Sequence, residues 1–271
     1  MLKAVECLKL GRSMPAFVGD KSYMAYFMRP NKSDPGLPIE DARDYCMCGC
    51  IDGNIQGKTR SCSIAMFVTT VMLDCFLNDG VDPKTGLRVD QPTGDLDAFK
   101  NFDEFYSAFK RAIKWYNSIG VEKGDIENSV VATLLPEPLL SALMTDGIKV
   151  GLDTRKRRFD YENGNLMNPV GMVNLAQCMY TIKRLVYDEK KLTLSEFKKV
   201  LDANWEGYED LRQQVIAEVP HYGNGDMYAD MELKYVNDLY YDICSTMYST
   251  RAKVYKAGLY AQDEWSVNEN F

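Results

Sequence analysis

The most unusual feature of this 271-residue sequence is a run of cysteines at alternate positions, Cys46, Cys48 and Cys50, followed by Asp52. In an extended segment, residues 50 and 52 point to the same side, which places a thiol and a carboxylate on one wall of a pocket. A thiolate nucleophile needs a cation or an imidazole to lower its pKa, whereas a nearby carboxylate repels the thiolate. A neutral thiol that transfers a hydrogen atom meets no such objection, so this pair suits radical chemistry better than nucleophilic chemistry.

Two other interpretations of the cysteine run stay open. Thiols on one face of an extended segment can converge on a metal ion, although zinc and iron–sulfur sites generally use C-x2-C or wider spacings. Buried cysteines also occur as small, unreactive apolar residues. His221 is the single histidine, which excludes a metal site with several histidine ligands, and we interpret it as structural.

The composition excludes several classes of function. Acidic residues outnumber basic ones by 39 to 32, giving a net charge of -7, which argues against nonspecific nucleic-acid binding. The sequence contains no nucleophile elbow, P-loop, dinucleotide-binding glycine motif or zinc-protease motif. The basic run at 155–158 is expected to be a solvated loop, with phosphate contact as the alternative.

The distribution of apolar residues indicates the compartment. Lys3 and Glu6 interrupt the first residues, so no signal-peptide core is present there. The most apolar stretch, 61–77, is shorter than a membrane span and carries Asp74, so we expect a buried helix. These features predict a cytoplasmic protein with reduced thiols and no membrane partner.

Helices separated by turn signals dominate the expected secondary structure. A cap-then-acid helix start occurs at 101–104, and Thr193 with Glu196 forms a capping box. A short β-branched run occupies 130–135, and the helix at 227–248 is expected to be the longest. After the first helix start, apolar residues recur in a stripe that faces a core or, alternatively, lines a ligand cage: Phe102, Phe105, Phe109, Ile113 and Tyr116. Alternating helices and short strands predict a helix-rich α/β fold without an internal domain boundary.

Gly49–Asp52, preceded by residues 41–45, resembles the active-site finger loop of glycyl radical enzymes. This family includes pyruvate formate-lyase, glycerol and propanediol dehydratases, choline trimethylamine-lyase and 4-hydroxyphenylacetate decarboxylase. Further segments match the family in order along nearly the whole chain, at 11–20, 77–83, 93–95, 102–105, 182–191, 204–212 and 220–226. Any one segment is a weak signal, but collinear agreement over all of them is a strong one.

The resemblance implies a partial ten-stranded α/β barrel, built from two parallel five-stranded halves, with the cysteine loop through its centre. By position, Cys50 is expected to form the thiyl radical that abstracts hydrogen from a small organic substrate. Asp52 occupies the place where many dehydratases and lyases have a glutamate that moves a proton to or from the substrate. Pyruvate formate-lyase has adjacent cysteines here, so Gly49 favours the dehydratase, lyase or decarboxylase branch. Cys46, Cys48 and Cys62 have no catalytic counterpart in the family.

The sequence also departs from the family pattern. The family's radical-bearing glycine lies in an R-V-x-G-Y motif that is absent here, and barrel strands expected before Met1 are absent too. We therefore expect residues 1–271 to be an internal part of one barrel domain, incomplete at both ends. Its glycyl radical is expected in a missing C-terminal segment or a complementary polypeptide, installed by a radical S-adenosylmethionine activase. No metal or cofactor is expected on residues 1–271 themselves.

The substrate and the function of the isolated chain stay open at this point. Residues 155–168 differ from the G-[AG]-x-Y-N stretch of the family, so a substrate-pocket strand is altered. The alternative function is a non-catalytic remnant or interaction module of the same fold. An incomplete barrel leaves open strand edges and uncovered apolar surface, so we expect the isolated chain to associate, including into homo-oligomers.

Overall fold

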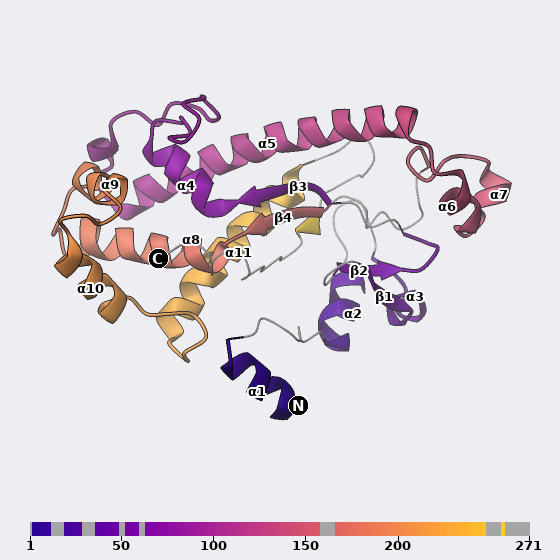
Figure 1. Cartoon of the computed structure of the whole chain (residues 1–271), viewed down its shortest axis with the longest axis horizontal. Coiled ribbons are helices and arrows are strands. Elements are labelled where there is room, and N and C mark those ends of the chain that lie inside the picture. The colour runs from indigo at the N-terminus through magenta and orange to yellow at the C-terminus, as the bar shows by residue number, and fades with distance from the viewer. Residues whose placement is uncertain are drawn as a thin grey trace. The chain divides into compact units, whose positions relative to one another are not determined.

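The computed structural model describes residues 2–11, 19–28, 36–48, 52–59, 63–157, 166–247 and 256–257. None of its described helices is long and apolar enough to cross a bilayer. In chain order the elements are α1 (Leu2–Lys9), α2 (Asp20–Met28), α3 (Ile39–Arg43), β1 (Tyr45–Cys48), β2 (Asp52–Ile55), β3 (Ser63–Val68), α4 (Thr69–Leu77), the 3-10 helix η1 (Leu96–Ala98), α5 (Phe102–Leu134), α6 (Pro138–Leu143), α7 (Gly147–Val150), β4 (Leu166–Val170), α8 (Met172–Ile182), the π-helix η2 (Lys183–Asp188), α9 (Leu194–Asp202), α10 (Glu209–Glu218), α11 (Met227–Thr246) and β5 (Lys256–Ala257) (Figure 1).

Residue contacts divide the chain into two compact units. The first, which we call the hairpin unit, comprises Met1–Met66, Gly120–Asn168 and Cys244–Phe271. The second, which we call the helical unit, comprises Phe67–Ile119 and Pro169–Ile243. That residues 1–271 belong to one barrel domain stays a prediction.

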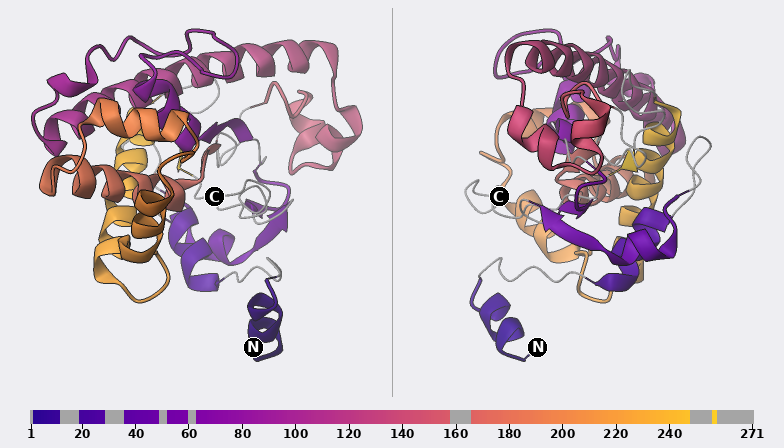
Figure 2. Two further views of the ribbon diagram at one scale, coloured as in Figure 1. Left: turned by 60° about the vertical axis from the view of Figure 1, so that its left-hand side comes forward. Right: turned by 90° about the vertical axis from the view of Figure 1, so that its right-hand side faces the viewer.

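The hairpin unit is organised around the antiparallel pair of β1 and β2. Figures 1 and 2 both show α2 and α3 beside this pair. Its core is a small cluster of buried side chains from these elements and the segment between α2 and α3: Phe27, Leu37, Ala42 and Ile55. The backbone also closes the cluster, because the Leu37 amide donates to the Phe27 carbonyl at 3.0 Å.

The helical unit packs α4, the first half of α5 and α8 through α11 around a larger core. Phe105, Phe109 and Ile113 of α5 are fully buried, so the predicted stripe faces a core. Phe105 and Phe109 belong to a chain of aromatic rings whose neighbouring centroids lie between 5.5 and 6.5 Å apart. Its members are Phe76, Phe99, Phe102, Phe105, Phe109 and Tyr187. The predicted capping box is confirmed at the start of α9, where Thr193 and Glu196 exchange hydrogen bonds.

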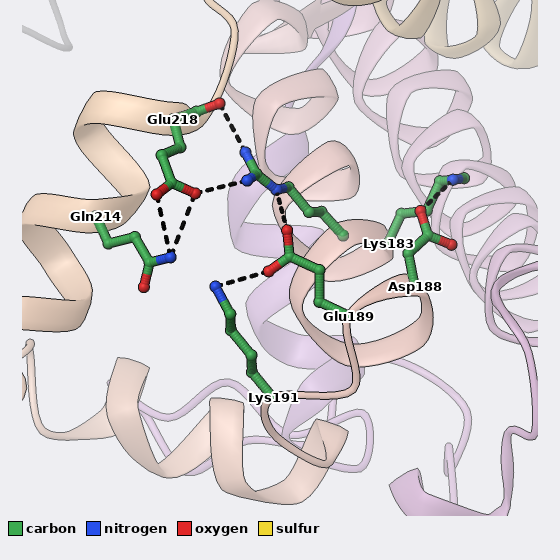
Figure 3. A network of polar contacts seen from close by, with 7 residues as sticks. Lys183, Asp188, Glu189, Lys191, Gln214 and Glu218 are labelled. Carbon is green, nitrogen blue, oxygen red and sulfur yellow. Dashed lines mark hydrogen bonds and ion pairs between the residues drawn. The ribbon is translucent and has the colours of Figure 1, made fainter.

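Polar contacts fasten the π-helix η2 to the end of α10. Arg184 donates to Glu189 at 2.6 Å and to both the carbonyl and the carboxylate of Glu218, at 2.8 and 2.5 Å. Lys191 and Gln214 extend the network by contacting the two carboxylates (Figure 3). These bonds hold two helix ends of the helical unit together.

The second sheet has the strand order β3-β4-β5. β4 and β5 pair in parallel, with Leu166 opposite Lys256 and Met167 opposite Ala257. β3 leads directly into α4, and β4 leads into α8 through Gly171, whose φ of +77° is a left-handed conformation that glycine adopts without strain. Parallel pairing with helices after the strands agrees with the predicted α/β class.

Three secondary-structure predictions are wrong in part. Residues 61–77 do not form one buried helix, because β-branched and aromatic residues at 63–68 form β3 before α4 begins. The β-branched run at 130–135 continues α5 as far as Leu134, which makes α5, with 33 residues, longer than α11 with 20. The helix α2 had no counterpart among the expected elements.

Candidate functional site

Cys46 and Cys48, the first two cysteines of the run, lie on β1 of the β1–β2 hairpin. The two strands pair in a simple antiparallel register: Tyr45 with Ile55, Cys46 with Asn54, Met47 with Gly53, and Cys48 with Asp52. Residues directly opposite each other in such a pair project from the same face, and successive residues alternate between faces. Tyr45, Gly53 and Ile55 therefore belong to the face that α2 covers.

Cys50 lies outside the described residues, together with Gly49 and Ile51. For Asp52 the structure describes the backbone, which begins β2, and not the side chain. Their catalytic roles stay predictions. The structure does correct the idea of one extended segment through residues 46–52, because Cys48 and Asp52 are opposed on antiparallel strands. Cys50 thus occupies the middle of the three-residue connection between two paired strand ends.

Gly53 brings β2 into unusually close contact with α2. A Cβ atom at this position would lie 2.4 Å from two ring carbons of Tyr23 and 3.1 Å from Phe27. No side chain other than hydrogen fits at such distances without displacing the aromatic ring. Only glycine, therefore, lets the hairpin backbone lie directly against α2.

Tyr45 adds a second contact between the hairpin and α2. Its ring stacks on that of Tyr23, with centroids 5.2 Å apart and planes 7° from parallel. Its hydroxyl donates to the carboxylate of Asp20, the first residue of α2, at 2.6 Å. The hydrogen bond to this carboxylate raises the pKa of Tyr45, because the neutral phenol is the form that donates.

A tight turn follows β2 at the end of the strand that is distant from Cys50. The amides of Lys58 and Thr59 both donate to the Ile55 carbonyl, at 3.1 and 3.0 Å. The buried Thr59 hydroxyl accepts from the Ile55 amide at 2.9 Å, so side chain and backbone secure the same residue. Lys58 also forms an ion pair of 2.6 Å with Asp41 of α3. The hairpin is thus held at the face that α2 covers and at the turn that follows β2.

The alternative interpretations of the cysteines gain no support from the described part of the chain. Cys46 is a free thiol of intermediate exposure, opposite Asn54. Among the described residues, no group of three histidine, cysteine or carboxylate side chains is arranged to hold a metal ion. Cys50 and Cys62 are not among these residues, so this observation does not test the full cluster.

The other residues that the sequence singled out have structural contacts. His221 is exposed, and its Nδ1 lies 3.1 Å from the side-chain amide nitrogen of Gln177. Within the basic run, Arg155 forms an ion pair of 2.7 Å with Glu137 and is mostly buried, while residue 158 is not described. The interpretation of 155–158 as a solvated loop is therefore wrong for Arg155, because a carboxylate draws its guanidinium inward.

Sequence reasoning missed the residues that support the hairpin. Gly53 was visible as a glycine inside a short strand, a pattern that signals a close backbone approach. Asp20 and Tyr23 were not identified because α2 shows no clear apolar periodicity, so their helix was not expected. The partner of a strand glycine lies 30 positions away in the chain, and only the folded structure reveals it.

Comparisons with known proteins agree along most of the chain. The sequence pattern of a family described as pyruvate formate lyase-like matches residues 1–264. The chain is 31% identical over 271 residues to (2S)-3-sulfopropanediol dehydratase of Klebsiella oxytoca, covering 99% of this chain and 32% of that protein. It is 30% identical over 240 residues to trans-4-hydroxy-L-proline dehydratase of Clostridioides difficile, covering 89% of this chain and 30% of that protein.

A solved structure gives the same result for the fold. The crystal structure of hydroxyproline dehydratase from Clostridioides difficile, with trans-4-hydroxy-L-proline bound, superimposes with a TM-score of 0.82 at 28% sequence identity. The match covers 94% of this chain and 32% of that one. This chain therefore spans about a third of the length of the relatives that it matches.

Proposed function

Because this chain belongs to the pyruvate formate lyase-like family and shares part of the barrel fold of glycyl radical enzymes, we propose that it is the cysteine-bearing part of a glycyl radical dehydratase, lyase or decarboxylase. Cys50 is the residue that abstracts hydrogen from a small organic substrate. Asp52 is the residue that moves a proton to or from that substrate. The activity requires a glycyl radical outside residues 1–271.

The observation that carries this proposal is the support of the hairpin on both sides of residues 49–51. A hydrogen-atom transfer demands close approach of sulfur to one C–H bond, and an error of about 1 Å can cost 100-fold in rate. Reactive groups are held most accurately when rigid elements carry them. The paired strands, the Gly53 contact with Tyr23 and the Tyr45 bond to Asp20 supply such elements in the segments that precede and follow residues 49–51 in the chain.

The chemistry of Cys50 follows from its neutral thiol. A glycyl radical supplies the unpaired electron, and the thiol gives up its hydrogen atom to become a thiyl. The thiyl sulfur then forms an S–H bond as one substrate C–H bond breaks, leaving the unpaired electron on carbon. After the substrate radical has rearranged or lost its leaving group, Cys50 returns the hydrogen atom. Cys50 is then a thiyl again, and its thiol is restored when the sulfur takes a hydrogen atom back from the glycine, which regenerates the glycyl radical.

Asp52 serves the proton transfers that accompany loss of the leaving group. In a dehydration, a hydroxyl departs as water only when it gains a proton, and a neighbouring carboxyl group can supply one. Because β2 begins at Asp52, its backbone is fixed by the same strand pairing that flanks Cys50. Aspartate is one methylene shorter than glutamate, so the substrate must approach β2 more closely than a glutamate at this position would require.

The named relatives indicate which substrates to test first. Dehydratases of (2S)-3-sulfopropanediol and of trans-4-hydroxy-L-proline act on small hydroxylated molecules. We propose a substrate of this class, with a hydroxyl or another leaving group beside the carbon that loses hydrogen. The partners are an activating enzyme of the radical S-adenosylmethionine type and the polypeptide that carries the radical glycine, and the protein works in the cytoplasm under anaerobic conditions.

The proposal is tested by anaerobic reconstitution. The chain is combined with candidate polypeptides that carry an R-V-x-G-Y segment and with a radical S-adenosylmethionine activase, and the glycyl radical is measured by electron paramagnetic resonance. Turnover is then followed on both named compounds. Cys50→Ala is expected to abolish turnover while the radical signal remains. Cys46→Ala, which removes a thiol from the same hairpin, is the matched control and is expected to retain turnover.

A second pair of variants separates the two proposed residues. Asp52→Asn keeps the size of the side chain and is expected to lower kcat at least 100-fold, since the amide cannot exchange the proton. Asp52→Glu is expected to retain activity, with KM changed more than kcat. If the reconstituted protein forms no radical and shows no turnover, the non-catalytic alternative holds. If turnover survives Cys50→Ala, the role proposed for Cys50 is wrong.

A further inference from the structure

The turn that follows β2, at the end of the strand distant from Cys50, is attached to another part of the hairpin unit. The Gly57 carbonyl accepts a hydrogen bond of 2.9 Å from the amide of Thr145, in the segment that joins α6 to α7. Gly57 has a φ of +75°, and a Cβ atom there would lie 2.9 Å from the Thr145 hydroxyl. The turn after β2 therefore fits against this segment both by a hydrogen bond and by the absence of a side chain.

The segment that receives Gly57 belongs to a region, residues 137–155, which we call the clasp. Its two ends are joined by charge, because Arg155 donates to the Glu137 carboxylate at 2.7 Å. They are also joined through Asp153, whose carboxylate accepts from the Glu137 amide at 2.6 Å and from the Arg155 amide at 2.8 Å. These bonds close the chain around α6 and α7.

The interior of the clasp is polar and closely packed. The Ser141 hydroxyl donates to the Glu137 carbonyl at 2.6 Å and accepts from the Thr154 amide at 2.9 Å. Ser141 and Thr154 are 8% and 1% exposed, so these bonds are shielded from water. A Cβ atom on Gly147 would lie 1.8 Å from the Ser141 carbonyl oxygen, which shows how closely α7 approaches α6.

We propose that the clasp is a positioning element for Cys50 and Asp52 and that Gly57 is the residue through which it acts. This inference rests on the function proposed above. β2 has four residues, about 13 Å at the usual rise per residue. A shift at its Ile55 end is therefore transmitted along the strand to Asp52. The Lys58 ion pair fixes the same turn to α3, and the Thr145 bond supplies the second fixed point.

Gly57→Ala tests the contact, and Gly151→Ala is its matched control. Both glycines have positive φ, +75° and +64°, so alanine introduces similar backbone strain at each. A Cβ at Gly151, which ends α7, would meet nothing within 4 Å, whereas one at Gly57 would meet Thr145. Any difference between the two variants therefore reports the contact and not the strain.

The first measurement is amide hydrogen exchange of residues 45–48 and 52–55 in the full chain, which needs no activity. We expect Gly57→Ala to accelerate exchange there at least about tenfold and Gly151→Ala to leave it within about twofold. Gly147→Ala, which breaks the clasp without touching the hairpin, is expected to act like Gly57→Ala. Equal exchange in the Gly57 and Gly151 variants, or no effect of Gly147→Ala, overturns the proposal.

The second measurement is turnover of (2S)-3-sulfopropanediol by the reconstituted enzyme, normalised to its glycyl radical content. Gly57→Ala is expected to lower kcat at least about tenfold with KM changed less than about twofold, since the reacting atoms move and the substrate contacts remain. Adding Thr145→Ala removes the hydroxyl but keeps the amide donor, and is expected to restore kcat to within about threefold of the parent. Failure of this rescue overturns the positioning role.

The two proposals fail in different ways. If the parent protein forms no radical and turns over neither named compound, the proposed function is wrong, and hydrogen exchange still decides whether the clasp positions the hairpin. If the parent is active and the Gly57 and Gly151 variants have the same kcat and the same exchange, the clasp proposal alone is wrong.

Discussion

Around the β1–β2 hairpin, the described core consists of the four buried residues Phe27, Leu37, Ala42 and Ile55, and much of the remaining contact is made by backbone against rings or by hydrogen bonds. The helical unit instead buries a continuous chain of aromatic rings between α4, α5 and η2. The first arrangement buries little apolar surface but leaves few alternative positions for the hairpin backbone. The second buries much more surface and so contributes more to stability.

This difference separates two jobs that packing can do. Apolar burial is non-directional, so a ring core tolerates small shifts of its helices without losing most of its free energy. A glycine against a ring, or a phenol on a carboxylate, loses its contact after a shift of less than 1 Å or so. We infer that the hairpin unit is built for accuracy and the helical unit for stability. Four substitutions test this contrast.

The largest expected effect on stability belongs to Phe105 in the helical unit. Its side chain is fully buried and contacts five other rings. Phe105→Ala is expected to lower the free energy of unfolding by about 3–5 kcal/mol, through lost burial and the cavity left behind. Urea denaturation measures the loss, and hydrogen exchange of residues 45–55 is expected to remain near the parent value. Equal loss of protection in the hairpin would remove the contrast between the units.

The second substitution, Gly53→Ala, is expected to lower the free energy of unfolding less than Phe105→Ala does, but to lower turnover more. Gly53→Ala is expected to destabilise the hairpin unit by about 1–3 kcal/mol, because the Tyr23 ring must leave its stack on Tyr45 to admit the new methyl group. Turnover of the reconstituted enzyme is expected to fall about 100-fold, since the strand beside Cys50 moves. Gly19→Ala is the control, because a Cβ there would meet only the Ser22 hydroxyl at 3.9 Å. Normal turnover in Gly53→Ala would contradict an accuracy role for this contact.

The third effect is a pH dependence confined to the helical unit. Asp90 is 3% exposed, and burial raises its pKa to about 6. The folded state therefore keeps a proton that the unfolded chain has lost, and the resulting stability is complete below about pH 4 and disappears as the pH rises through 6. Asp90→Asn keeps an acceptor for the Gln91 amide and removes the charge. It is expected to be more stable than the parent at pH 7, by at least about 1 kcal/mol, and equal to it near pH 4.

Thermal or urea unfolding at both pH values measures this effect. A parent protein whose stability does not fall between pH 4 and pH 7 relative to Asp90→Asn would show that burial does not raise the pKa of Asp90. The hairpin unit has no share in this effect, so its hydrogen exchange should differ little between the two proteins.

The sequence predicts the two units to different extents, for a physical reason. The α5 stripe and the capping box at Thr193 both follow from local patterns of residue type, and the structure confirms them. The contacts that hold the hairpin join Gly53 to Tyr23 and Gly57 to Thr145, across 30 and 88 positions. A glycine in a strand or turn indicates that another part of the chain packs closely against it, but the sequence does not identify that part. For this reason Cys50 and Asp52 could be singled out by type, while the residues that we propose to position them could not.

The smallest expected effect lies in the ion-pair network on the helical unit. Arg184 is partly buried and donates to the carboxylate of Glu189, which follows η2, and to the carboxylate and carbonyl of Glu218 at the end of α10 (Figure 3). Its substitution therefore leaves several acceptors to be satisfied by water. Arg184→Gln is expected to lower the free energy of unfolding by roughly 1 kcal/mol, at the upper end for surface pairs because the geometry is networked. Lys234→Gln, which breaks the isolated and more exposed pair with Asp238 in α11, is the control and is expected to leave the free energy of unfolding near the parent value. Raising the salt concentration to 1 M should shrink the difference between the two variants, because it screens exposed charges.

A loss above about 3 kcal/mol for Arg184→Gln, comparable with that for Phe105→Ala, would mean that directional polar contacts also stabilise the helical unit. Accuracy and stability would then not be divided between the two units.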